Sequence, residues 1–167
     1  MKTAVDSNIL FDLLNAAPSE PISAERVLAA ASESGSIVLC PVVYAELTAS
    51  FEHQQGLDTF LTDLGVLLEP FSVEALWRAG EAWRLYTRRR GQRIQCPRCG
   101  QQFRLQCPAC QSPVAWRQHL ISDFLIGGHA LAQADGLITR DVGYYRTYFP
   151  RLRLIIPASG ENGDARP

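Results

Sequence analysis

Short apolar runs bounded by turn-forming residues alternate along the chain with longer stretches of helical periodicity. The apolar runs predict strands at residues 3–5, 37–40, 66–68, 137–139 and 152–156. Apolar side chains spaced three or four residues apart predict helices at residues 9–15, 24–32, 43–51, 57–64, 73–90 and 122–134. This alternation is typical of an α/β domain with a mostly parallel sheet, in which a functional site lies beyond the carboxyl ends of the strands.

One segment interrupts the alternation. Residues 94–116 lie between two predicted helices and contain four of the five cysteines. We interpret this segment as a small insert within a main domain that spans residues 1–157. The final segment, residues 158–167, is mostly polar and contains glycine and proline, so we expect it to be disordered.

The composition narrows the class of protein. With 167 residues, of which 47% are hydrophobic and 20% charged, the chain is long and apolar enough to form one globular domain with a buried core. It has no apolar run approaching the roughly 18 residues of a membrane span, which excludes an integral membrane helix. We recognise no secretion signal, so the expected location is a reducing cytoplasm.

The net charge of −1 conceals a marked separation of charge along the chain. Residues 1–81 carry twelve acidic and three basic side chains, whereas residues 82–122 carry eight arginines and no Asp or Glu. Such a basic block indicates a nucleic-acid contact. A bias of this chain toward arginine would explain the choice of Arg over Lys, but not the absence of acids. The candidate residues for this nucleic-acid contact are Arg88, Arg89, Arg90, Arg93, Arg98 and Arg104.

The cysteines of the insert form two Cys-x-x-Cys hooks, separated by seven residues: Cys96 and Cys99, then Cys107 and Cys110. Four thiolates suit a tetrahedral structural zinc ion, and they leave no open position for a catalytic water. Two disulfides are the alternative, which a reducing compartment disfavours. Zinc would stabilise a fold too small for its own core. That fold would display an arginine and aromatic surface suited to phosphates and unstacked bases.

Four carboxylates are candidates for metal-dependent chemistry. Asp6, Glu46 and Asp141 each follow a predicted strand, and Asp123 lies where a helix begins. Taken alone, Asp6 is equally a helix cap and Asp141 a turn residue. Taken together, carboxylates at strand ends would repel one another without a cation, and Mg²⁺ or Mn²⁺ prefers oxygen ligands. Such clusters serve the hydrolysis of phosphodiesters.

Four segments, AVDSNILFDLL, VVYAEL, ISDFLIGGHAL and GLITRDVGYYRTYFP, resemble the PIN-domain nuclease family, and within it the VapC-like toxin branch. The resemblance implies an α/β PIN fold with helices on both faces of the sheet. It assigns Asp6, Glu46 and Asp123 to the metal-binding acids and Asp141 to a fourth acidic position, with Asn8 and Thr139 in support. It also implies one or two Mg²⁺ or Mn²⁺ ions, cleavage of RNA to a 5′-phosphate and a 3′-hydroxyl, a cognate antitoxin and a homodimer.

The cysteine insert departs from the family pattern, which has a short loop at this place, and it leaves more than one function open. The leading hypothesis is a metal-dependent endoribonuclease acting as the toxin of a toxin–antitoxin pair. A housekeeping RNA-processing nuclease, whose insert recognises one structured RNA, is the alternative within the same class. A non-catalytic module that binds nucleic acid or protein is the alternative from another class.

Overall fold

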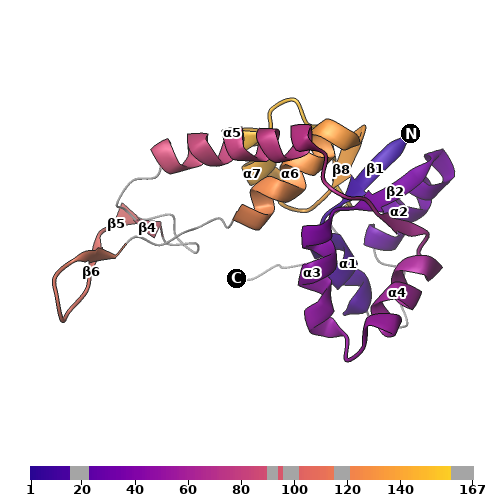
Figure 1. Ribbon diagram of the computed structural model, residues 1–167, viewed down its shortest axis with the longest axis horizontal. Helices are drawn as coiled ribbons and strands as arrows, with labels where there is room; N and C mark the ends of the chain where they lie inside the picture. The colour runs from indigo at the N-terminus through magenta and orange to yellow at the C-terminus, as the bar shows by residue number, and fades with distance from the viewer. Residues whose placement is uncertain (16–22, 90–93, 96–101, 115–120, 159–167) are drawn as a thin grey trace, which may run out of the picture.

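The computed structural model describes residues 1–15, 23–89, 94–95, 102–114 and 121–158. Five parallel strands form one sheet in the order β3-β2-β1-β8-β9 (Figure 1). Their bounds are Lys2–Val5 (β1), Ser36–Leu39 (β2), Val66–Leu68 (β3), Gly136–Ile138 (β8) and Leu154–Ile155 (β9). The prediction of an α/β domain with a parallel sheet is confirmed.

Seven helices in the described residues surround this sheet. Their bounds are Ser7–Leu14 (α1), Ser23–Ser34 (α2), Pro41–Leu47 (α3), Gln54–Asp63 (α4), Val73–Arg89 (α5), Ile121–Gln133 (α6) and Val142–Tyr148 (α7). The helix predicted at 43–51 divides into α3 and a 3₁₀ turn, Thr48–Ser50. The last helix, α7, was not predicted. None of the helices in the described segments combines the length and apolar character needed to span a membrane.

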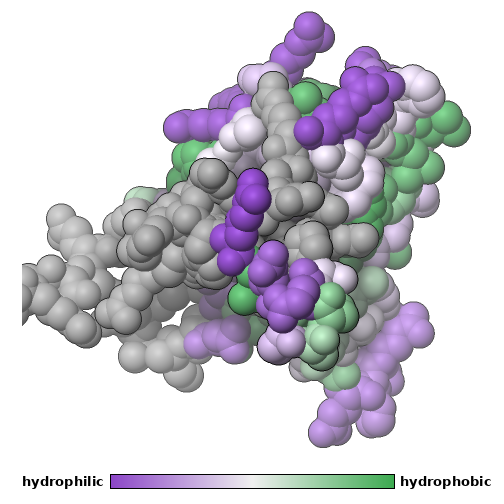
Figure 2. All heavy atoms as spheres, turned by 90° about the vertical axis from the view of Figure 1, so that its left-hand side faces the viewer, coloured by the Kyte–Doolittle hydropathy of each residue, from purple (hydrophilic) through white to green (hydrophobic). Residues whose placement is uncertain are grey.

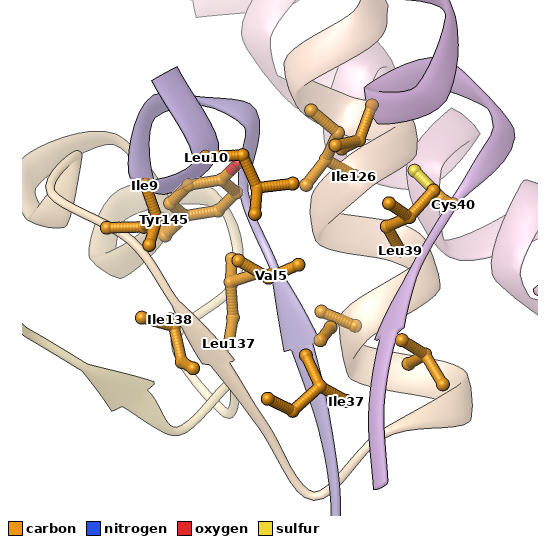
Figure 3. Packing of buried hydrophobic residues seen from close by; sticks show 14 of the residues in the cluster. Val5, Ile9, Leu10, Ile37, Leu39, Cys40, Ile126, Leu137, Ile138 and Tyr145 are labelled. Atoms are coloured by element: carbon orange, nitrogen blue, oxygen red, sulfur yellow. The ribbon is translucent and has the colours of Figure 1, made fainter. Parts of the chain in front are cut away.

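The core lies between the sheet and its helices (Figure 3). Val5, Leu39 and Ile138 come from three adjacent strands and are almost completely buried. Because a parallel sheet is covered on both faces, its strands are continuous apolar runs rather than alternating ones. This explains why short unbroken apolar runs marked the strands in the sequence.

Helices α5 and α6 lie side by side, and glycine in α6 allows their close approach (Figure 1). A Cβ on Gly128 would lie 2.5 Å from the carbonyl oxygen of Ala75 and 2.9 Å from the Cβ of Ala79, both on α5. A Cβ on Gly127 would overlap the ring of Phe149. These two glycines therefore pack against α5 and the end of α7.

An aromatic cluster joins α5, α6 and α7. Phe124, on α6, lies at its centre and is fully buried. Its ring makes edge-on contacts with Trp83 at 5.1 Å and with Tyr144 at 5.2 Å between centroids. Tyr86, Tyr148 and Phe149 complete the cluster. Since Asp123 precedes Phe124 in the chain, the cluster fixes the part of α6 that carries a candidate metal ligand.

The insert contains two short antiparallel strand pairs. Ile94–Gln95 (β4) pairs with Gln102–Phe103 (β5), and Leu105–Gln106 (β6) pairs with Pro113–Val114 (β7). Each pair brackets one Cys-x-x-Cys hook in the sequence. The insert extends beyond the ends of α5 and α6, away from the sheet (Figure 1). Residues 159–167 of the predicted disordered tail lie outside the described residues.

Candidate metal-dependent active site

The candidate site forms at the carboxyl ends of the two central strands. Asp6 follows β1 and Thr139 follows β8, and the backbone amide of Asp6 donates to the carbonyl oxygen of Ile138 at 3.0 Å. Because β1 and β8 are neighbours in the sheet, two residues separated by 133 positions become adjacent. The topology thus places Asp6 and Thr139 beyond the carboxyl ends of adjacent parallel strands. The strand-end rule, that functional sites lie beyond the carboxyl ends of parallel strands, predicts a site at this edge.

Donors fix the carboxylate of Asp6, which is 5% exposed. Its Oδ2 accepts hydrogen bonds from Thr139 Oγ1 at 2.6 Å, Asn8 Nδ2 at 2.9 Å and the hydroxyl of Tyr145 at 3.2 Å. Its Oδ1 has one weak side-chain contact among the described residues, with Ser7 Oγ at 3.5 Å. Asp6 lies at the N-cap position of α1, but across the described chain its carboxylate makes no capping hydrogen bond. The helix-cap interpretation of this residue therefore does not hold.

The partners of the Thr139 hydroxyl show which hydrogen bonds it accepts and which one it donates. Its Oγ1 accepts from Asn8 Nδ2 at 3.2 Å and from the backbone amide of Asp141 at 3.0 Å, so its single hydrogen is directed to Asp6. The Oδ1 of Asn8 accepts from the amide of Arg140 at 3.3 Å, which points the Asn8 amino group to the carboxylate. Asn8 and Thr139, predicted to support the acids, thus both contact Asp6.

The other three acids come from three different helices. Glu46 on α3 and Asp123 in the first turn of α6 are half-buried, whereas Asp141 is exposed at the N-cap of α7. The Oδ1 of Asp141 accepts a hydrogen bond from the amide of Tyr144 at 3.3 Å. Asp141 therefore caps α7 with one oxygen, as the turn interpretation of this residue suggested.

The pKa shifts of Asp6 and Tyr144 indicate which acidic side chains lie within electrostatic range of each other. Burial raises the pKa of Asp6, against the hydrogen bonds from Thr139 and Tyr145 that lower it, and the negative charge of Glu46 raises it further. Burial also raises the pKa of Tyr144, as do the charges of Asp123, Asp141 and Asp6. The charges of three acids thus act on one buried ring, and the charge of Glu46 acts on Asp6.

The donor set fits a hard divalent cation. Carboxylate oxygens are the ligands that Mg²⁺ and Mn²⁺ prefer, and a cation would offset both the burial of Asp6 and its repulsion from Glu46. Within the described segments, no three Asp, Glu, His or Cys side chains are close enough together to enclose a metal ion. The acids are therefore linked through their charges, but the described residues do not form a closed coordination shell.

Sequence reasoning missed Tyr145. The residue lies on α7, is 2% exposed, and donates directly to Asp6. Burial and the charges of Asp6 and Asp123 raise its pKa well above the ordinary value. No pattern in the sequence indicated it, because the run that contains it was not predicted to be a helix.

The basic block is described only in part. Arg88, near the end of α5, and Arg104, in the insert, are exposed. The view from the side of the insert shows strongly hydrophilic side chains among the described residues of this face (Figure 2). The side chain of Arg89 and residues Arg90, Arg93 and Arg98 lie outside what the structure describes.

The second cysteine hook forms a tight turn. The amide of Cys107 donates to the carbonyl oxygen of Ser112 at 2.9 Å, and the amide of Gln111 donates to that of Cys107 at 2.8 Å. Gln111 follows the hook and has a φ of 59°, in the left-handed region that favours glycine. The pKa of the Cys110 thiol is lowered by hydrogen bonding with Ser112 and with the thiol of Cys107. The two thiols of this hook are therefore neighbours.

The first cysteine hook, Cys96 and Cys99, lies in a different part of the insert sequence from the second. Cys96 and Cys99 lie outside the described residues, so the four-cysteine zinc site is not placed as a whole. In the sequence, Gly100 occupies the position that Gln111 occupies after the second hook. The alternative of disulfides does not hold for the second hook, where Cys107 and Cys110 are both free thiols.

Comparisons with known proteins agree with this architecture. The sequence profile of the PIN domain matches residues 3–150. Two solved structures are similar at 18% sequence identity, each covering 93% of this chain and 98% of the other. One is VapBC2 from Rickettsia felis bound to a DNA fragment from its promoter, with a TM-score of 0.61, and the other is VapBC-1 from nontypeable Haemophilus influenzae, with a TM-score of 0.59. No curated protein sequence matches the chain.

Proposed function

The chain belongs to the PIN-domain family, and from this premise we propose that it is a metal-dependent endoribonuclease, the toxin of a toxin–antitoxin pair. One observation carries the proposal. A buried carboxylate, Asp6, is held by three donors at the carboxyl end of the sheet and shares an electrostatic environment with Glu46, Asp123 and Asp141. Such an arrangement is costly in a protein without a cation to offset it.

The four acids would hold Mg²⁺ or Mn²⁺, and a bound ion would supply a water of lowered pKa and polarisation of the scissile phosphate. Thr139 and Asn8 orient Asp6 so that its Oδ1 remains available. Asp141 is anchored through Oδ1 at the start of α7, which leaves its other oxygen for a ligand. Exposed arginines such as Arg88 and Arg104 would bind the RNA backbone and offset its repulsion from the acidic N-terminal half.

Substitution of Asp6 tests the acidic site. Asp6→Asn keeps the shape of the side chain but removes its charge, so we expect loss of Mn²⁺ binding and of cleavage of a mixed RNA pool. Asp63→Asn, an exposed position on α4, is the matched control and should behave as wild type. Unchanged Mn²⁺ affinity in Asp6→Asn would contradict the proposed metal-dependent nuclease and favour the non-catalytic binding module.

We also propose that the insert binds one structural zinc ion through Cys96, Cys99, Cys107 and Cys110. Support comes from the tight turn at Cys107, from the adjacent thiols of the second hook, and from glycine at the equivalent position after the first hook. Elemental analysis of protein purified under reducing conditions should find about one zinc per chain.

A pair of cysteine substitutions separates this site from the core. Cys107→Ser should lose the zinc while the main domain stays folded. Cys40→Ala, which changes a buried cysteine at the end of β2, should retain it. Protein without zinc, or Cys107→Ser protein with full zinc content, contradicts the proposal.

The partner proposals rest on the similarity to VapBC complexes and on the family resemblance. We propose a cognate antitoxin and a homodimer. Growth arrest on expression, relieved by the product of a small neighbouring gene, is the result expected of a toxin. Growth without arrest, together with cleavage at one site in a structured RNA, favours the housekeeping nuclease instead. Analytical ultracentrifugation measures the oligomeric state directly.

A further inference from the structure

The two oxygens of the Asp6 carboxylate have unequal roles. Oδ2 accepts three side-chain hydrogen bonds, at 2.6, 2.9 and 3.2 Å, whereas the one described side-chain contact of Oδ1 is at 3.5 Å. An oxygen with three donors has no capacity for a further strong ligand. Oδ1 is therefore the oxygen with more capacity left for a ligand.

Among the three donors, Tyr145 contributes its hydroxyl from a buried aromatic ring. Its ring is buried in the same hydrophobic cluster as Ile9, Leu10 and Val5 (Figure 3). It also makes an edge-on contact with Tyr144 at 4.9 Å between centroids. Asn8, in contrast, is half-buried on the first turn of α1. A buried aromatic ring with neighbours on several sides leaves its hydroxyl little freedom to move.

We propose that Tyr145 is a positioning residue for the metal site: its hydroxyl holds Asp6 in the orientation that presents Oδ1 to the cation. The inference rests on the proposed function. Tyr145 also links two of the acids, because it lies on the helix that Asp141 caps and reaches to the strand end that carries Asp6. The orientation of Asp6 is thereby coupled to the position of α7.

A purely structural hydroxyl would give a different result on substitution. A buried hydroxyl that only satisfies its own hydrogen bond affects stability when removed, but not the affinity for a metal ion. A hydroxyl that orients a ligand affects metal affinity, since loss of such outer-shell contacts weakens binding about 10- to 100-fold. The affinity of the full-length protein for Mn²⁺ alone, measured by electron paramagnetic resonance of free Mn²⁺, separates the two roles.

The test compares Tyr145→Phe with Tyr44→Phe. Both remove a hydroxyl that donates to an aspartate, Tyr44 donating to Asp58 at 2.7 Å on the surface. We expect Mn²⁺ to bind Tyr145→Phe about 10- to 100-fold more weakly than wild type, and Tyr44→Phe as wild type. If Tyr145→Phe fails to fold, 4-fluorophenylalanine at position 145 fills the space of the hydroxyl without donating, and it should show the same loss.

The outcomes separate the two proposals. If Asp6→Asn loses Mn²⁺ while Tyr145→Phe binds it within twofold of wild type, the positioning role is wrong and the acidic site stands. If Asp6→Asn binds Mn²⁺ as wild type does, the acidic site itself is wrong. An equal loss of affinity in Tyr44→Phe also overturns the positioning role, because it would show that the effect is not specific to Asp6.

Discussion

Two glycines in the middle of helices are expected to respond in opposite directions to the same substitution. Gly80 on α5 is exposed, and a Cβ there would meet no atom within 4 Å among the described residues. Gly128 on α6 faces the backbone of α5, where a Cβ would lie 2.5 Å from Ala75 O and 2.8 Å from Ala79 N. Both glycines lie in the interior of an α-helix, so alanine has the same local effect on the backbone at both positions. The difference in stability between the two variants therefore reports on helix packing.

The magnitudes follow from the two environments. Gly80→Ala removes only the conformational cost of glycine and should stabilise the protein by about 0.5–1 kcal/mol. Gly128→Ala has the same local benefit, but α5 and α6 must separate, and such overpacking costs about 1–3 kcal/mol. Because the clash involves backbone atoms, the upper part of that range applies, which leaves a net loss of about 1–2 kcal/mol.

Thermal unfolding followed by circular dichroism measures both effects. For a chain of this size, 1 kcal/mol corresponds to about 2–4 °C in Tm. We therefore expect Gly80→Ala to melt about 1–4 °C above wild type and Gly128→Ala about 2–8 °C below it. A Gly128→Ala protein as stable as wild type would refute the argument that glycine sets the distance between these helices.

Three further predictions concern the site, the basic block and the insert. Thr139→Val removes the shortest hydrogen bond to Asp6 and should weaken Mn²⁺ binding about 10- to 100-fold, whereas Thr139→Ser, which keeps the hydroxyl, should bind normally. Arg88→Gln should reduce the slope of log affinity for single-stranded RNA against log salt by about 0.7, if this side chain contacts one phosphate, and an unchanged slope excludes that contact. Replacing residues 94–114 with a short Gly-Ser linker should leave Mn²⁺ affinity intact while raising the KM for RNA; loss of Mn²⁺ binding would show that the insert shapes the acidic site.

Local patterns were sufficient for most elements of the fold, and their failure at α7 has a physical cause. All five predicted strands and six predicted helices are present, with shifted ends. The segment 142–148 contains a glycine and several aromatic and β-branched residues, which are poor helix formers. It is helical because Asp141 caps it and because Tyr144 packs edge-on against Phe124. Both causes are visible only when the chain is folded.

The same distinction applies to the site. The strand-end rule brings Asp6, Thr139 and Asp141 together because β1 and β8 are neighbours, and an apolar run followed by a polar residue is a local signal. The contribution of Tyr145 depends on which way α7 turns after Asp141, and no local signal carries that information. The glycines of α6 show a similar limit: only the folded chain shows that Gly128 packs against α5 and Gly127 against Phe149.

Asp6 and Asp141 occupy equivalent positions, each at the N-cap of a helix after a central strand, yet they use their carboxylates differently. Asp141 caps its helix, whereas Asp6 forgoes a cap worth about 1 kcal/mol and directs Oδ2 to Thr139, Asn8 and Tyr145. Hydrogen bonds to a charged group contribute about 1.5–3 kcal/mol each, and these offset the burial of the carboxylate only in part, since its pKa remains raised. The fold thus keeps one carboxylate in an unfavourable state that a cation at Oδ1 would relieve. A residue needed only to start a helix would not be held in this way.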